Sequence, residues 1–293
     1  FELPGDFPSS VIKEMKKLKD EIPEEELKTR KDFRTITTFT IDPYDAKDFD
    51  DALSIRKLDN GNWEIGVHIA DVSYYVPEGS ALDQEAKSRA TSVYLVDRVI
   101  PMLPEKISNE LCSLRPNEDK LTYSAIFEMD ENAHVLNHQI GRSIIHSDRR
   151  FTYEEVQEVI ENGKGNFADE IHTLNKLATS LRKKKFEQGA ISFESEEVKF
   201  RLDENGKPVE VIRKHRKEAH MLIEDFMLLA NRTVAAYGYG LAKNYDDKPF
   251  VYRVHDLPPQ DKIESFAQVA ARFGHKINTR NTQQLSFALN NLL

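Results

Sequence analysis

Five aspartates fall within the eleven residues IDPYDAKDFDD, and this crowding is the strongest candidate for chemistry in the sequence. Carboxylates a few ångströms apart repel one another, and burial strengthens the repulsion because less water screens it. A divalent cation would offset that cost, and oxygen ligands without histidine or cysteine suit Mg²⁺ or Mn²⁺. The stretch therefore indicates a metal site drawn from Asp42, Asp45, Asp48, Asp50 and Asp51.

The segments on both sides of this acidic turn (residues 42–51) alternate between apolar and polar residues, which is typical of β-strands. The first segment reads TITTFTI and the second DALSIRKL. A connection that folds these two strands together lets Asp42 approach Asp50 and Asp51 across the strand pair. We therefore expect the carboxylates to converge between two strands rather than to extend into solvent as a polar tail.

Two other interpretations of the acidic turn are a solvated surface turn and a calcium loop. An EF-hand loop needs glycine at its sixth position and glutamate at its twelfth, and counting from Asp42 or Asp48 finds neither. A solvated turn is common in proteins, but Asp50 and Asp51 directly precede apolar strand residues, where an uncompensated charge pair is costly. This favours the metal site and leaves the solvated turn as the alternative.

The composition indicates a globular protein of 293 residues with 39% hydrophobic residues and a formal net charge of −9. That length suits one large domain or two ordinary ones, and the absence of a low-complexity linker or repeat favours one. The negative charge argues against binding nucleic acid by bulk electrostatics alone, although a basic channel can lie inside an acidic molecule.

The predicted compartment follows from one cysteine and from the absence of two sequence patterns. Cys112 is the single cysteine, which rules out an internal disulfide framework and fits a reducing environment. No apolar run approaches the length of a membrane span, and the N-terminus lacks the basic start and apolar stretch of a signal peptide. We predict a cytoplasmic protein without a membrane anchor.

The chain is predicted to be α+β, with mixed and largely antiparallel sheets packed with helices, because hairpins and helices occur without regular alternation. Residues 1–30 resemble a lead-in from an upstream domain, and residues 31–293 form the domain itself. The Asn60-Gly61 pair favours a two-residue hairpin turn. Further strands are predicted at 62–72, 121–130, 134–148, 191–203, 209–215 and 249–256, and helices at 9–22, 82–90, 152 onward, 168–188, 217–237 and 258–274.

Six motifs, in order along nearly the whole chain, give the sequence a family resemblance. They are IDPYDAKDFDDALS, IADVSYYV, TSVYL, IPMLPEKISNELCSL, GAISFESEE and IEDFMLLAN. Together they resemble the catalytic (RNB) domain of the ribonuclease II/ribonuclease R family, with SVYL and ISFESEE nearer to the bacterial ribonuclease R branch. The resemblance implies an RNB fold and an exoribonuclease that degrades single-stranded RNA from its 3′ end.

The resemblance also assigns roles to four of the five aspartates. In the family, the positions matching Asp42, Asp48, Asp50 and Asp51 organise magnesium at the scissile phosphate, whereas Asp45 has no counterpart among them. This implies a two-metal hydrolysis that releases nucleoside 5′-monophosphates, with Asp50 the most sensitive position because it acts between the metals. The physical logic agrees, since metals lower the pKa of water and neutralise charge on the attacking and leaving oxygens.

Four further residues match family positions that contact RNA. Tyr94 and Phe193 correspond to the aromatic residues that clamp stacked bases, and Tyr153 and Glu224 to the pair that contacts ribose and distinguishes RNA from DNA. Stacking suits a sequence-tolerant enzyme because every base has a π-face, and the 2′-hydroxyl is the group that marks RNA. From the residues alone, Phe193 equally fits a core aromatic, and Glu224 a charge flanking an apolar helix stripe.

Other charged groups have simpler interpretations. The clusters Arg149-Arg150 and RKHRK (residues 213–217) could line an RNA channel, whereas RKKK (residues 182–185) fits a solvated helix face. His68 and Asp71 resemble an acid–base pair, but a hydrogen-bonded strand histidine is the better interpretation.

The sequence departs from the family pattern at its end. Nothing after Asn278 resembles the family's Ser-Pro-Ile-Arg-type signature, and the flanking cold-shock and OB-fold domains that capture RNA are absent. We therefore expect a catalytic domain truncated at its C-terminus that is weak or inactive as a fragment. The alternatives are a non-catalytic RNA-binding scaffold of the same fold and a calcium-stabilised structural module.

Overall fold

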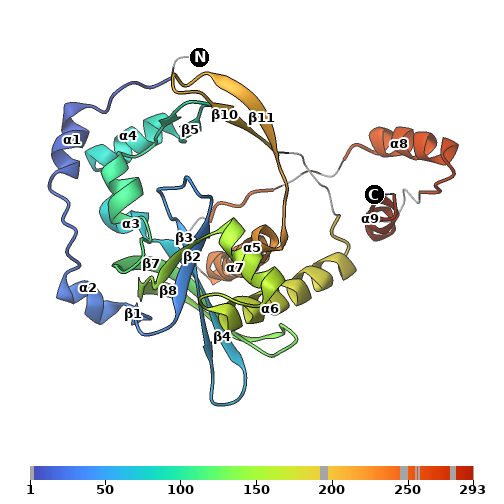
Figure 1. Ribbon diagram of the computed structural model, residues 1–293, viewed down its shortest axis with the longest axis horizontal. Helices are drawn as coiled ribbons and strands as arrows, with labels where there is room; N and C mark the ends of the chain where they lie inside the picture. Colours follow the sequence, from blue (N-terminus) through green and yellow to red (C-terminus); the bar gives the residue numbers. More distant parts are fainter. Residues whose placement is uncertain are drawn as a thin grey trace.

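A computed structural model describes residues 3–191, 197–244, 250–254, 256, 258–277 and 282–292. Its centre is a seven-stranded sheet in the order β1-β8-β7-β4-β3-β2-β9 (Figure 1). The inner pairs are antiparallel, and the two outer strands, β1 and β9, pair in parallel with their neighbours. The strands are β1 (Lys31–Asp32), β2 (Thr38–Asp42), β3 (Asp51–Lys57), β4 (Trp63–Ala70), β7 (Asp119–Met129), β8 (Val135–His146) and β9 (Arg149–Thr152). This confirms the predicted α+β class.

The sheet buries both faces because consecutive residues of a strand point to opposite sides. Ala52 and Leu53 are neighbours in β3, yet they belong to two different apolar clusters. One face is covered by α5 (Tyr153–Asn162), α6 (Ala168–Glu187) and α7 (Glu218–Asn244). The other is covered by α1 (Ser9–Met15), α2 (Glu24–Thr29), α3 (Val72–Tyr75), α4 (Ala81–Arg89) and the π-helix η1 (Lys106–Leu111).

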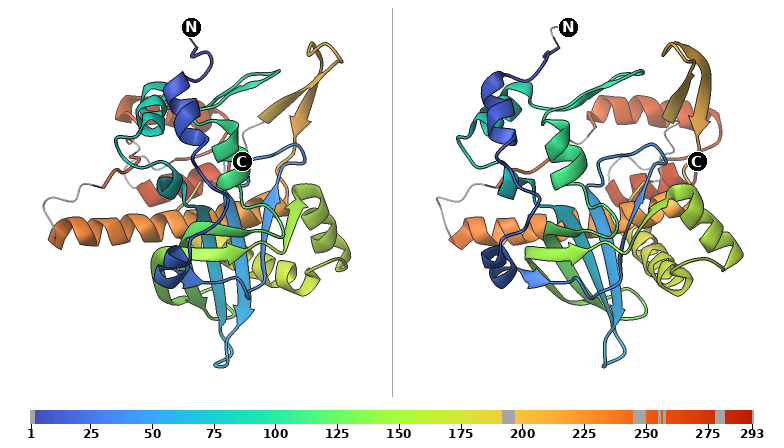
Figure 2. Two further views of the ribbon diagram at one scale, coloured as in Figure 1. Left: turned by 90° about the vertical axis from the view of Figure 1, so that its left-hand side faces the viewer. Right: turned by 60° about the vertical axis from the view of Figure 1, so that its left-hand side comes forward.

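Two small hairpins stand apart from this central sheet (Figure 2). The first pairs β5 (Val93–Tyr94) with β6 (Val99–Ile100), and the second pairs β10 (Glu197–Leu202) with β11 (Pro208–Lys214). Two further helices, α8 (Gln260–Arg272) and α9 (Thr282–Asn290), lie near the C-terminus. No helix among the described residues is long and apolar enough to cross a membrane.

Two local predictions are confirmed by the structure, and a third is partly wrong. A turn at Asn60-Gly61 joins β3 to β4, but it is a three-residue turn rather than the predicted two-residue one: the Leu58 N–H donates to the Asn62 carbonyl at 2.9 Å, and Gly61 has positive φ (85°) whereas Asn60 does not. The capping box at the start of α5 is present, with Thr152 accepting from the Glu155 backbone and Glu155 from the Thr152 backbone. α6 ends at Glu187, close to its predicted end at Gln188.

Two predicted elements are wrong. The helix predicted over residues 9–22 ends at Met15, and a separate helix, α2, follows. Residues 250–254, predicted as strand, form no strand. Their aromatic side chains instead lie on α7: a Cβ added to Gly238 would lie 2.7 Å from the Phe250 ring, and the Tyr252 hydroxyl donates to the Ala235 carbonyl at 3.3 Å.

Candidate active site

The acidic turn connects β2 to β3 at the edge of the central sheet. The antiparallel register of the two strands pairs Phe39 with Leu53, which places Asp42 at the end of β2 close to the start of β3. Asp42 is buried with 8% exposure, Asp51 is half-buried and Asp50 is exposed. The register thus brings Asp42 near Asp50 and Asp51, whose charges act on it.

The aspartates act on one another electrostatically. Burial, followed by the charges of Asp51 and Asp50, raises the pKa of Asp42 to about 7, although the nearby Thr40 hydroxyl and Arg150 guanidinium offset part of this rise. Burial and then Asp50 raise the pKa of Asp51 to about 6. Burial and then Asp48 raise the pKa of Asp50.

The turn therefore holds more negative charge than the protein neutralises. The Oδ2 atom of Asp42 is buried without a hydrogen-bond partner among the described residues. Unpaired buried oxygens and carboxyl groups that resist ionisation are what a cation site presents before the ion binds. As placed, no three His, Cys, Asp or Glu side chains in the described ranges form a ready metal-binding group. Asp42, Asp48, Asp50 and Asp51 are thus suited to a divalent cation by charge and donor type.

The backbone of the acidic turn is held in place by neighbours from other elements. Phe49 donates its backbone N–H to the Ser113 hydroxyl at 3.0 Å, and the Phe49 carbonyl accepts from Leu114 at 2.8 Å. The Asp50 carbonyl accepts from the Ala70 N–H of β4 at 2.9 Å. The positions of Asp50 and Asp51 along the turn are therefore fixed by backbone contacts that do not involve their carboxylates.

Arg150 of β9 contributes the strongest side-chain restraint on the turn. Its Nη2 donates to the carbonyls of Pro43 and Tyr44, the latter at 2.9 Å, and its guanidinium lies 5.5 Å from the centre of the Phe49 ring. The sequence suggested that Arg149 and Arg150 face an RNA channel, but Arg149 instead pairs with Glu155 at 3.1 Å. Arg150 was missed as a positioning residue because its partners lie more than a hundred residues earlier in the chain.

We expect Arg150→Met to loosen the acidic turn. The substitution removes two charged hydrogen bonds to backbone carbonyls, each worth about 1.5–3 kcal/mol, so amide hydrogens of residues 44–50 should exchange at least about tenfold faster. Hydrogen–deuterium exchange with mass spectrometry measures this directly. Arg149→Met is the matched control, since it removes a neighbouring guanidinium that does not touch the turn, and equal exchange in both variants would contradict the assignment.

Tyr94 lies on β5 beside the acidic turn. Its side chain is 70% exposed. Burial, followed by the charges of Asp48 and Asp50, raises the pKa of Tyr94, so the hydroxyl lies near these carboxylates. An exposed ring in this position is suited to stacking a base next to the carboxylates. Tyr44, on the turn itself, is 83% exposed, and the sequence analysis assigned it no role.

Tyr153 and Asp42 are brought together by the parallel pairing of β9 with β2. Thr152 lies opposite Asp42 in this register, and Tyr153 follows as the first residue of α5. The Tyr153 ring stacks on His220 of α7, with ring centres 4.1 Å apart. Burial and then the charges of Asp51, Asp42 and Glu224 raise the pKa of Tyr153 to about 12, so its phenol stays protonated.

Glu224 lies on α7 near Tyr153 and is partly exposed. It forms an ion pair with Arg216, whose Nε donates to Glu224 Oε1 at 2.9 Å. The carboxylate therefore flanks the apolar stripe of the helix and faces the site, in agreement with its effect on Tyr153. Phe193, the second predicted base clamp, lies outside the described residues.

The predicted solvated RKKK face is only partly correct. Lys183 is exposed, but Arg182 pairs with the buried carboxylate of Asp225 at 2.8 Å and with Glu218 at 3.1 Å. Lys185 also pairs with Asp225, at 3.1 Å. These contacts join α6 to α7, so this basic cluster fixes the helix that carries Glu224.

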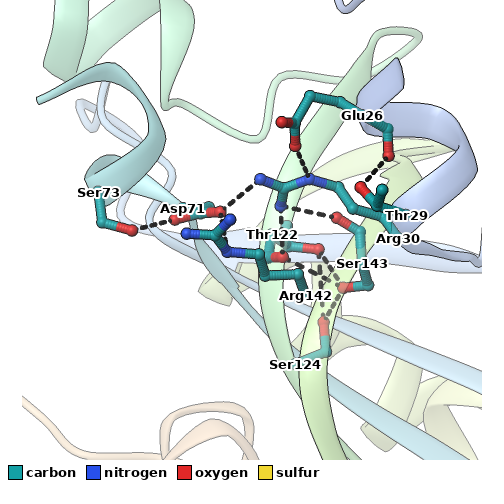
Figure 3. Close-up of polar contacts among 9 residues, drawn as sticks. All are labelled: Glu26, Thr29, Arg30, Asp71, Ser73, Thr122, Ser124, Arg142 and Ser143. Carbon is teal, nitrogen blue, oxygen red and sulfur yellow. Dashed lines mark hydrogen bonds and ion pairs between the residues drawn. The ribbon is translucent and has the colours of Figure 1, made fainter. Parts of the chain in front are cut away.

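The sequence favoured a hydrogen-bonded strand histidine over a His68–Asp71 acid–base pair, and the structure confirms this. His68 is buried between the hydroxyls of Ser124 and Ser54, at 2.6 and 2.8 Å, and burial lowers its pKa to about 3. Asp71 forms a buried ion pair with Arg30 at 2.7 Å, and Arg142 lies 3.7 Å from the same carboxylate (Figure 3). Both residues therefore have structural partners away from the acidic turn.

Comparison with known proteins agrees with this geometry. The family model described as RNB domain matches residues 30–293. The chain belongs to the RNB domain family. It is 44% identical to a ribonuclease R of Thermotoga maritima, over 96% of this chain and 41% of that protein. The RNB fold of Mycoplasma genitalium RNase R, solved with ribose-methylated single-stranded RNA, superposes with a TM-score of 0.87 at 27% identity, covering 99% of this chain and 46% of that chain.

The same fold also occurs in a protein described as lacking nuclease activity. The yeast protein Ssd1, described as a pseudonuclease, superposes with a TM-score of 0.72 at 20% identity over 92% of this chain and 33% of that chain, which shows a shared fold. The present chain spans less than half the length of the ribonuclease R relatives that it matches. Activity must therefore be argued from the acidic turn and its surroundings rather than from the RNB fold.

Proposed function

We propose that this RNB domain is the catalytic part of a 3′–5′ exoribonuclease that hydrolyses single-stranded RNA to nucleoside 5′-monophosphates in the cytoplasm. The observation that carries the proposal is the uncompensated charge of the acidic turn: Asp42 and Asp51 are buried enough to raise their pKa values to about 7 and about 6. A non-catalytic scaffold gains nothing from this repulsion, which costs folding free energy. We also predict that the parent protein carries flanking cold-shock and OB-fold domains that bind RNA.

Asp42, Asp48, Asp50 and Asp51 would hold the cations, and the donor set accepts Mg²⁺ or Mn²⁺. Two bound cations would supply an activated water and neutralise charge on the attacking and leaving oxygens of the phosphodiester. The protein's own part is to hold the four carboxylates at the sheet edge, which the backbone contacts of Asp50 and the Arg150 restraint achieve.

The surroundings of the turn suit the terminal nucleotides of RNA. The exposed ring of Tyr94 offers a surface for a base, and the protonated phenol of Tyr153 can donate to a ribose 2′-hydroxyl while Glu224 accepts from it. DNA lacks that hydroxyl and would leave both groups without their ligand. Tyr153 and Glu224 would therefore select RNA over DNA. Base stacking would allow the enzyme to accept any RNA sequence. Phe193 is proposed as the second stacking residue by family resemblance alone.

The proposal is tested with a 5′-labelled single-stranded RNA and a DNA of the same sequence, each incubated with the chain and Mg²⁺ or Mn²⁺. Because a weak fragment is expected, the incubation uses excess protein and long times, and we expect the RNA to shorten slowly from its 3′ end in single-nucleotide steps, the DNA to persist, and a chelator to stop the reaction. Calorimetric titration with Mn²⁺ checks the cation site without requiring turnover. Internal cleavage, equal loss of DNA, or neither Mn²⁺ binding nor RNA shortening would contradict the proposal.

A further inference from the structure

The hairpin β10–β11 has two chemically different faces. Side chains alternate between the faces along each strand, so Val198 and Phe200 share one face with Val211, which lies opposite Phe200. All three are exposed. The other face carries Lys199 and Arg201 among its charged residues. The apolar face therefore contributes little burial, and the charged face carries the contact with the catalytic region.

That contact is an ion pair between Lys199 and Asp45. Lys199 Nζ lies 2.6 Å from Asp45 Oδ2, and the two residues are 154 positions apart in the chain. Asp45 is the aspartate of the acidic turn that is not among the four proposed cation ligands. Its carboxylate is thus available to hold the hairpin while its neighbours hold cations.

The turn of the same hairpin lies beside the β5–β6 hairpin. Gly206, in the turn between β10 and β11, has φ of 76°, and a Cβ added to it would lie 3.9 Å from the Cβ of Asp97. Asp97 lies in the turn that follows Tyr94 of β5. Figures 1 and 2 show the far end of β10–β11 beside β5–β6. The hairpin therefore contacts the acidic turn and lies beside the element that carries the exposed tyrosine.

We infer that the Lys199–Asp45 ion pair positions the β10–β11 hairpin against the acidic turn and so fixes the spacing between the cation ligands and the base-stacking elements. Both side chains are about 60% exposed, so water screens the pair and it contributes little to stability. The ion pair instead affects where the hairpin lies, because the hairpin's side chains are mostly exposed and packing does little to hold it. Lys199 is thus a positioning residue, and its relevance to RNA rests on the proposed function.

Distance measurements between spin labels test the positioning without RNA. One label is placed at Asn205→Cys in the hairpin turn and the other at Glu158→Cys on α5, both exposed, while the native Cys112 is buried. We expect a single narrow distance distribution that becomes at least about twofold broader with Lys199→Met, and also at high salt, which screens exposed ion pairs. The charge exchange Asp45→Lys with Lys199→Asp should restore the narrow distribution.

Arg201→Met is the matched control, because Arg201 pairs with Glu210 inside the same hairpin at 2.8 Å and does not reach the acidic turn. Equal distributions in Lys199→Met and Arg201→Met, or no recovery on charge exchange, would overturn the inference. Binding measurements test whether the positioning matters for RNA. Lys199→Met should weaken affinity for single-stranded RNA about twofold to fivefold and leave Mn²⁺ affinity unchanged. If the distances respond but wild type binds neither RNA nor Mn²⁺, the proposed function fails and the positioning stands.

Discussion

Asp50→Asn is expected to lower the rate of RNA hydrolysis by about a hundredfold to a thousandfold, the loss typical when a group that stabilises transition-state charge is removed. The side chain of Asp50 is exposed, and its neighbours Asp48 and Asp51 lie on both sides of it in the turn. Its backbone carbonyl is held by the Ala70 N–H at 2.9 Å, a bond that asparagine retains. The loss should therefore come from chemistry, with the fold intact.

Single-turnover release of nucleoside 5′-monophosphate from 3′-labelled RNA measures this effect. Asp59→Asn is the matched control, since it removes the same charge from an exposed turn at the opposite end of β3. Thermal melting of both variants should match that of wild type to within a few degrees. A rate in Asp50→Asn within tenfold of wild type would remove Asp50 from the site.

Asp42→Asn is expected to stabilise the protein in the absence of divalent cations. Burial raises the pKa of Asp42 from its ordinary 3.8 to about 7, so keeping this group ionised at pH 8 costs the folded state up to about 4 kcal/mol. Asparagine has nearly the same shape and no charge, so the variant should recover part of that cost. We expect the same substitution to abolish the rise in stability that Mn²⁺ gives to wild type.

The pH dependence identifies the cause of this stabilisation. Between pH 3.8 and about 7 the folded state binds the Asp42 proton more tightly than the unfolded state, so the contribution of Asp42 to stability falls as the pH rises. The difference in unfolding free energy between Asp42→Asn and wild type should therefore be small near pH 4 and grow to a plateau above pH 7. Urea unfolding at a series of pH values with a chelator present measures it. A difference independent of pH would assign the effect to packing.

The features that sequence predicted well are local. The Thr152–Glu155 capping box depends on neighbours within a few residues, and the structure contains it. A turn at Asn60-Gly61 is also present, although it is one residue longer than predicted. The acidic turn was recognised for the same reason, because five carboxylates between two strands are visible without a fold. Backbone propensity and turn chemistry act over that range, so sequence patterns report them.

The features that sequence did not predict depend on contacts between distant segments. Nothing near Arg150 indicates that its partners are the Pro43 and Tyr44 carbonyls, and nothing near Lys199 indicates Asp45. Arg182 illustrates the same limit, because a run of basic residues resembles a solvated face until α7 places Asp225 against it. Periodicity shows which face of an element is apolar, but the register of the whole sheet decides which charges meet.

The parallel pairing of β2 with β9 has a consequence for when the site comes into existence. The pairing includes a hydrogen bond from the Thr38 N–H to the Asp148 carboxylate, between residues 110 positions apart, and it ends with Asp42 opposite Thr152. Contacts closing such long loops form late, since the loop entropy must be lost before the contact stabilises the chain. During synthesis the acidic turn leaves the ribosome well before β9 does. A partly made chain thus carries the aspartates without Arg150 or Tyr153, and the surroundings of the acidic turn are complete only when the sheet is.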